Sequence, residues 1–225
     1  MKSSSKLDAI HQILGIEDAF LAPAALREIL FQKERREEVF RKLLKLHDYD
    51  LSYDWFHQYF QEEHADRKSK KQDFTPQSVA KLLHALVGTD QGSYFECACG
   101  TGGLVITAWN DNRLKVLPWE YNPMNHFFQL EELSDRTIPF LLLNLMIRGI
   151  NATVMHGNSL TRKSKGVFFV QNFENQAVNF SDLHVFPYTK ATEELFQITF
   201  EKQEYPEHVE RSHADFIEEV SDDTD

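Results

Sequence analysis

The chain has 225 residues, of which 42% are hydrophobic, and a formal net charge of −11. This length suits one domain of ordinary size with an appendage. The sequence contains no apolar run of about 18 residues and begins without a long apolar stretch, so we expect neither a membrane span nor a secretory signal. Cys97 and Cys99, the only cysteines, are poorly placed for a disulfide and too few for a zinc site. We therefore expect a reducing, cytoplasmic location and no metal.

The negative charge is concentrated at the C-terminal end. Between Ala191 and Asp225 there are twelve acidic and two basic residues, so the rest of the chain is near neutral. A solvated, flexible tail over residues 201–225 that is dispensable for folding is one interpretation. The alternative is a tether for a basic protein partner, or a phosphate mimic that occupies a basic groove.

The N-terminal third has the periodicity of helices. Apolar residues recur at helical spacing over residues 4–64, and Pro23 suits the first turn of a helix. We expect a helical N-terminal region over residues 1–71 whose apolar stripes serve packing. The basic cluster from Arg67 to Lys71 is either a solvated linker or a contact to a phosphate backbone.

The stretch from Tyr94 to Ala108 predicts a short strand, a tight turn and the start of a helix. Gly100, Gly102 and Gly103 allow positive φ and leave no Cβ in the way of a ligand. The helix that follows directs free N–H groups at whatever lies over the turn. This spacing is neither the dinucleotide pattern nor the phosphate-loop pattern, so the turn alone predicts only a nucleotide-type cradle.

The octapeptide Glu-Cys-Ala-Cys-Gly-Thr-Gly-Gly, residues 96–103, resembles the Asp-Pro-Ala-Cys-Gly-Thr-Gly-Gly signature of adenine-N6 DNA methyltransferases. The nearest group is the modification subunit of type I restriction systems, which also begins with a helical domain. Glu96 and Cys97 replace the Asp and Pro of that signature. The resemblance extends from about Gln72 to Leu160 and implies S-adenosylmethionine as the cofactor.

Two other segments add to the resemblance. Phe74-Thr75-Pro76 is similar to the family's motif before the glycine turn, which implies that Phe74 packs on the cofactor and Thr75 meets its methionine end. Residues 152–160 suggest a third strand and its exit, and Asn158 lies there at the position where the family has an Asp that holds the adenine amino group. An amide oxygen can accept the same hydrogen bond. The expected cofactor-binding residues are Phe74, Thr75, Glu96, Ala98, Gly100, Gly102, Glu120 and Asn158.

Glu120 enters that set because of its spacing. Residues 114–120 suggest a second strand that ends in an acid 20 residues after Gly100. Nucleotide-binding α/β folds place a carboxylate for the ribose hydroxyls at about this separation. The alternative is a surface acid after a strand. A helix over residues 124–148, broken near Pro139, should follow.

The half of the site that would hold the target base is incomplete in the sequence. The family holds a flipped adenine with Asn-Pro-Pro-aromatic after the fourth strand, and this tetrapeptide is absent. Asn172 as amide acceptor and Phe173 as stacking ring are the catalytic candidates. A hairpin is the simpler interpretation, with strands over 167–172 and 179–186 and a turn over 173–178.

Together these patterns predict an α/β protein. A helical N-terminal region is followed over residues 72–200 by a Rossmann-like methyltransferase sheet, truncated or remodelled at its C-terminal side. The expected function is that of an S-adenosylmethionine-binding DNA adenine-N6 methyltransferase, similar to a type I methylase subunit, that reaches DNA through a separate specificity subunit. The alternative is a non-catalytic, cofactor-binding interaction or regulatory protein of a phage or mobile element.

Overall fold

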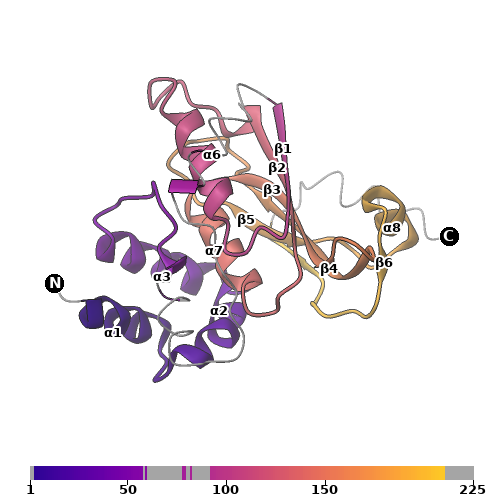
Figure 1. Cartoon of the computed structure of the whole chain (residues 1–225), viewed down its shortest axis with the longest axis horizontal. Coiled ribbons are helices and arrows are strands. Elements are labelled where there is room, and N and C mark those ends of the chain that lie inside the picture. Colours follow the sequence, from indigo (N-terminus) through magenta and orange to yellow (C-terminus); the bar gives the residue numbers. More distant parts are fainter. Residues whose placement is uncertain (1–2, 58, 60–77, 80–81, 83–91, 211–225) are drawn as a thin grey trace.

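The computed structural model describes residues 3–57, 59, 78–79, 82 and 92–210. The helices α1 (Ser3–Leu14), α2 (Ala22–Leu30) and α3 (Lys33–Leu46) and the 3-10 turn η1 (Ala19–Leu21) form one cluster beside a sheet (Figure 1). Pro23 lies in the first turn of α2, as predicted. The apolar stripes of these helices face inward, and Leu26, Phe40 and Leu43 are fully buried. Among the described residues no helix is long and apolar enough to cross a membrane.

The described residues form a sheet of seven strands, and its first half is parallel. Strands β1 (Gly92–Cys97), β2 (His126–Glu132) and β3 (Asn151–Asn158) pair in that order. Helix α6 (Gly103–Arg113) connects β1 to β2, and α7 (Ile138–Ile147) connects β2 to β3. Because the three strands are parallel, their carboxyl ends meet at one edge of the sheet, where an open α/β sheet binds its ligand.

The second half of the sheet is antiparallel. A connection of four residues leads from β3 into β4 (Lys163–Gln171), which runs back along β3 from Lys163 beside Asn158 to Val170 beside Ala152. Strand β5 (Asp182–Val185) pairs antiparallel with β4, which confirms the predicted hairpin. The remaining elements are α8 (Lys190–Phe196), β6 (Thr199–Phe200) and β7 (His208–Val209). The predicted fold class, an α/β sheet remodelled at its C-terminal side, is confirmed.

The expected second strand was wrong. Residues 114–120 form turns in which Leu114 and Leu117 are 68% and 50% exposed, and the Glu120 carboxylate accepts a 3.2 Å hydrogen bond from the Leu117 N–H. The strand lies further along at His126–Glu132, inside the segment expected to be helical. Its alternating side chains allow Phe128 and Leu130 to pack into the core.

The two faces of the sheet are covered differently. On the inner face, Phe128, Val154 and Phe168 pack in the same cluster as α7, all ten of whose residues are buried. On the outer face, a smaller cluster of Met155, Val167, Phe169, Phe186 and Ile198 lies beneath the segment of α8. The parallel strands β1 and β2 therefore receive less cover on their outer face than on their inner face.

The C-terminal segment over residues 200–210 is part of the fold, which corrects the expectation of a dispensable tail from residue 201. Tyr205 is 4% exposed, and β7 pairs with β5. Glu204 accepts from Arg27 of α2 at 2.8 Å. We call this segment, residues 200–210, the C-terminal strap. Residues 211–225 of the acidic tail lie outside the described part of the chain.

The strap holds α3 through a buried ion pair. Arg36 and Glu210 have side chains 1% and 4% exposed, and both carboxylate oxygens accept from the guanidinium, at 2.5 and 2.7 Å. Burial by itself would raise the pKa of Glu210, but hydrogen bonds from Arg36 and His208 lower it to about 2. The ionised pair is thus the stable form at neutral pH.

We expect Glu210→Gln to lower the free energy of unfolding by about 3–5 kcal/mol at pH 7, because it leaves the buried Arg36 charge without its partner. The matched control is Glu201→Gln, whose carboxylate is 44% exposed and 3.9 Å from Lys163; it should cost less than about 1 kcal/mol. Because the folded-state pKa of Glu210 is depressed, its contribution is present above the unfolded value and is lost as the pH falls from about 4.5 to about 2. Urea titrations across this range measure both effects, and equal losses in the two variants at pH 7 would contradict the prediction.

Candidate cofactor site

The glycine turn after β1 has the geometry of a cradle. Ala98, Gly100 and Gly102 all have positive φ, at 60°, 59° and 92°. Gly102 is the N-cap of α6, and a Cβ built on it would lie 2.9 Å from Cδ1 of Leu141. The turn therefore depends on glycine at this position for both its conformation and its close contact with α7. The first backbone N–H groups of α6 are directed toward the space above the turn.

A carboxylate at the end of β2 is bonded to this turn. Glu132 accepts a 2.7 Å hydrogen bond from the Gly100 N–H and a 2.8 Å bond from the Ser134 N–H, one on each oxygen. Its side chain is largely buried, on the inner face of the sheet. Glu132 thus lies at the end of the second strand, the position at which the sequence spacing predicted Glu120. The signal for it was the alternation of apolar residues in His126–Leu130 directly before two acids.

Glu96 provides a second carboxylate at the end of β1. It accepts a 2.9 Å hydrogen bond from the Tyr94 hydroxyl. Burial, reinforced by the nearby charge of Glu132, raises the pKa of Glu96 to about 7, although the bond from Tyr94 opposes this shift. Near neutral pH the Glu96 carboxyl group is therefore only partly ionised. A cationic ligand at this edge would favour its ionised form.

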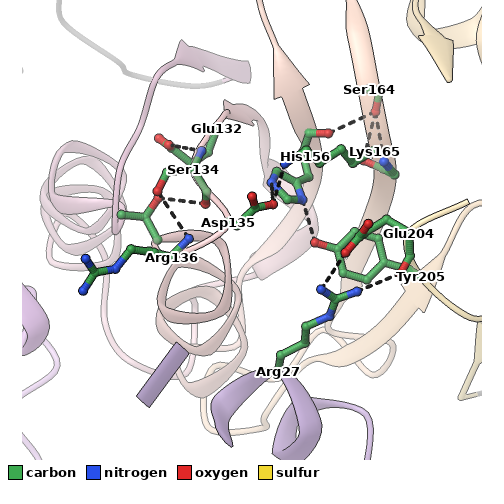
Figure 2. A network of polar contacts seen from close by, with 12 residues as sticks. Arg27, Glu132, Ser134, Asp135, Arg136, His156, Ser164, Lys165, Glu204 and Tyr205 are labelled. Atoms are coloured by element: carbon green, nitrogen blue, oxygen red, sulfur yellow. Dashed lines mark hydrogen bonds and ion pairs between the residues drawn. The ribbon is translucent and has the colours of Figure 1, made fainter. Parts of the chain in front are cut away.

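The loop that carries Glu132 is fixed from the far side by the strap (Figure 2). Asp135 accepts from Lys165 at 2.6 Å and lies 3.2 Å from Nε2 of His156. Nδ1 of His156 is 2.6 Å from the hydroxyl of Tyr205. Burial lowers the pKa of His156 to about 4 even though Asp135 opposes the shift, so the contact with Asp135 at pH 7 involves a neutral ring. The network joins the loop after β2 to β3, β4 and the strap.

A buried polar network fixes the other side of the turn. The Thr101 hydroxyl donates to Asp54, which also accepts from the Asn144 side chain at 2.9 Å. Arg148 donates to the Asn144 side-chain oxygen at 2.8 Å and to the carbonyls of Leu51 and Tyr53. Thr101, Asn144 and Arg148 are at most 2% exposed. The segment after α3 is thereby joined to α7 and to the glycine turn, and sequence patterns did not identify Asp54 as a member of the site.

Of the other residues expected to bind the cofactor, one lies at the edge of the glycine turn and one lies away from it. Asn158 ends β3 at the same edge as the glycine turn, and its side-chain oxygen accepts from the N–H groups of Leu160 and Thr161, at 2.9 and 3.0 Å. Glu120 lies in the exposed turn before β2, so the strand that motivated its selection does not exist. Phe74 and Thr75 fall outside the described residues.

Asn172 and Phe173 do not lie at the edge that carries the glycine turn. Because β4 is antiparallel to β3, its end lies beside the beginning of β3, and the Asn172 N–H donates to Asn151 at 2.7 Å. Strand β3 has eight residues, so this end is roughly 20 Å from the turn. The Asn172 side chain donates to the carbonyls of Gly149 and Gln176 and is 1% exposed. The structure therefore does not bring this pair to the glycine turn, and the Asn172 side chain closes the hairpin.

The chain matches a known protein family. The model of the N-6 DNA methylase family matches residues 47–182, more than half of the chain, and spans Asp54, the glycine turn and Glu132. Searches of curated proteins and of solved structures found no match.

Two neighbouring glycines test the geometry of the turn. Gly102→Ala should lower the free energy of unfolding by roughly 1–3 kcal/mol, because it adds a Cβ at φ 92° against Leu141. Gly103→Ala is the control, since its Cβ meets nothing within 4 Å and alanine favours the helix by up to about 1 kcal/mol. Thermal or urea unfolding distinguishes the two, and equal stability of both variants would contradict the assigned turn.

Proposed function

The chain belongs to the N-6 DNA methylase family, and on that premise we propose that it binds S-adenosylmethionine over the glycine turn. The observation that supports this most strongly is the hydrogen bond from Gly100 to Glu132, which joins the ends of two parallel strands at the turn. A flexible glycine backbone, a helix N-terminus and a largely buried carboxylate are the groups that a nucleoside with hydroxyls requires.

Each residue of the site has a proposed part. Glu132 exchanges its bond to the loop for bonds from the ribose hydroxyls, since a carboxylate accepts two such bonds at once. Glu96 adds negative charge that favours a sulfonium cation. Asn158 accepts from the adenine amino group, and Phe74 and Thr75 contribute the contacts that the family motif implies.

The proposed reaction is methyl transfer to N6 of an adenine in DNA, the substrate of this family. The cofactor, when bound, supplies the methyl group. The residues of the chain bind the cofactor, orient it through the turn and Glu132, and restrict water at the site. Positioning therefore provides most of the lowering of the activation barrier. DNA reaches the site through a separate specificity subunit, similar to type I systems. The acidic end of the chain is an added surface for a basic protein.

A second candidate function is cofactor binding without catalysis, in an interaction or regulatory protein. The observation that favours it is the location of Asn172, because neither this amide nor an Asn-Pro-Pro-aromatic sequence is available beside the turn. A flipped base needs polar contacts to its edge and a stacking partner. Under this proposal the cofactor half of the site is retained and the base half is not.

Cofactor affinity distinguishes Glu132 from Glu120. In calorimetric titrations with S-adenosylmethionine, Glu132→Gln should weaken binding by about 1.5–3 kcal/mol, because it replaces a charged acceptor of hydrogen bonds. Glu120→Gln is the control and should bind like the wild type, as its carboxylate caps an exposed turn. Circular dichroism verifies that both variants fold. An absence of wild-type binding at millimolar cofactor would reject the proposed site, and a loss confined to the Glu120 variant would reject its assignment to Glu132.

Activity distinguishes the two functions. We expect the purified chain to methylate unmodified duplex DNA at least ~10²-fold more slowly than an authentic adenine methyltransferase, since one lost preorganised contact in a transition state costs ~10²–10³ in rate. The measurement is transfer of tritium from labelled cofactor to mixed-sequence DNA. Turnover equal to that of the authentic enzyme, without an added subunit, would contradict the prediction and the non-catalytic alternative.

A further inference from the structure

Strand β1 lies at an edge of the sheet (Figure 1). It pairs with β2 on one side, and among the described residues no strand pairs with its other side. Its six residues contain no lysine, arginine or proline, the residues that usually protect an edge from association. The opposite edge is β7, which has only two residues and is protected by its shortness. In the described part of the chain, the unprotected edge of this sheet is therefore β1.

The side chains of β1 differ between the two faces. Tyr94 and Glu96 point to the inner face, where the Tyr94 ring lies 5.5 Å from that of Phe128. Ser93, Phe95 and Cys97 point to the outer face and are exposed, Phe95 by 61%. An exposed aromatic ring in the middle of an unpaired edge is a recurrent site of strand addition.

We propose that two copies of this chain associate through antiparallel pairing of their β1 strands. The two-fold axis is normal to the sheet and passes between Phe95 and Phe95 of the partner subunit. The interface is then isologous, as in most soluble homodimers. The two sheets become one continuous sheet, and each β1 gains hydrogen bonds along its free edge.

Side-chain faces determine this register. Residues directly opposite each other in a sheet share a face, so Phe95 can be opposite a second Phe95 while Ser93 is opposite Cys97 and Tyr94 opposite Glu96. A register centred on Tyr94 would instead put Phe95 opposite Ser93 and leave both rings largely exposed. The Phe95-centred register therefore buries more apolar area and adds a cross-strand aromatic pair.

The outer face continues across this interface. A cavity of about 480 Å³ lies there, lined by Phe127, Met155 and Phe196, with Phe95 at its β1 side. Pairing about the proposed axis keeps both cavities on one face and covers the two Phe95 rings between them. It also sets Ser93 of the partner subunit beside Cys97, next to the glycine turn. The dimer follows from the edge and its side chains and does not rest on cofactor binding.

Cysteine pairs test the register directly. In a Cys97→Ser background, Phe95→Cys should form an intersubunit disulfide under mild oxidation, because Cα atoms of directly opposed residues lie about 4.5–5.5 Å apart, within the range of a disulfide. Ser93→Cys should form one with the native Cys97 and lose it when Cys97 is also replaced by Ser. Leu160→Cys, at a position 95% exposed, is the control in the Cys97→Ser background. Cys99 is buried in every variant.

Sedimentation of the unmodified chain supplies the second measurement. We expect a dimer whose association strengthens with salt, since each chain carries −11. Phe95→Lys should weaken association by roughly tenfold or more, because it sets like charges opposite each other, while its circular dichroism spectrum stays that of a folded chain. A monomer at 100 µM in ~0.5 M salt, or crosslinking of Leu160→Cys equal to that of Phe95→Cys, would overturn the proposal. A disulfide for Phe95→Cys without one for Ser93→Cys would overturn the register.

Discussion

The guanidinium of Arg148 is the group on which the arrangement of the site depends. Burial lowers its pKa to about 9 in spite of the nearby Asp54 carboxylate, so it remains charged at neutral pH and needs acceptors on every side. It obtains them from Asn144 and from the carbonyls of Leu51 and Tyr53. Asn144 in turn holds Asp54 and the Thr101 carbonyl. A single buried charge thereby sets the positions of the N-terminal segment, α7 and the glycine turn relative to each other.

The reversal of the chain after β3 is the constraint that limits what this site can do. A four-residue connection cannot carry a parallel crossover, which needs a dozen or more residues, so β4 returns along β3. Side chains at the end of β4 are thus displaced from the ligand-binding edge by the length of a strand. Among the described residues, the ends of β1, β2 and β3 supply Glu96, Glu132 and Asn158 at that edge, and these groups suit a nucleoside better than they suit a second, stacked base.

Local patterns were sufficient for the elements that are defined locally. The glycine turn, α6, β3 and the β4–β5 hairpin follow from residue types within a few positions of each other. The second strand was not predictable in this way, because residues 114–120 and His126–Glu132 have comparable strand patterns. The choice between them depends on pairing with β1, a contact between segments about 30 residues apart. The same limitation explains why spacing selected Glu120 rather than Glu132.

The packing of the strap was also not predictable from the sequence, because its acidic residues indicated a solvated segment. One local sign was present: Arg36 shares the buried face of α3 with Val39, Phe40 and Leu43, and a charge at such a position requires a partner. The sequence could not say that the partner was Glu210. Likewise, the hydrogen bonds of Asn172 join the turn after β4 to the residues between α7 and the start of β3, and no pattern within one segment predicts them.

The ion pair between Arg36 and Glu210 has a consequence for synthesis of the protein. Helices α1 to α3 leave the ribosome before the sheet, and the carboxylate that neutralises the buried guanidinium is 174 residues after Arg36. At typical rates of about 5–20 residues per second, the N-terminal region waits roughly ten seconds or more for its partner. During that interval α3 carries an unpaired charge on its apolar face and lacks the sheet against which it packs. The helical cluster is thus made before the sheet and the strap, and it is among the last parts of the described fold to reach its final packing.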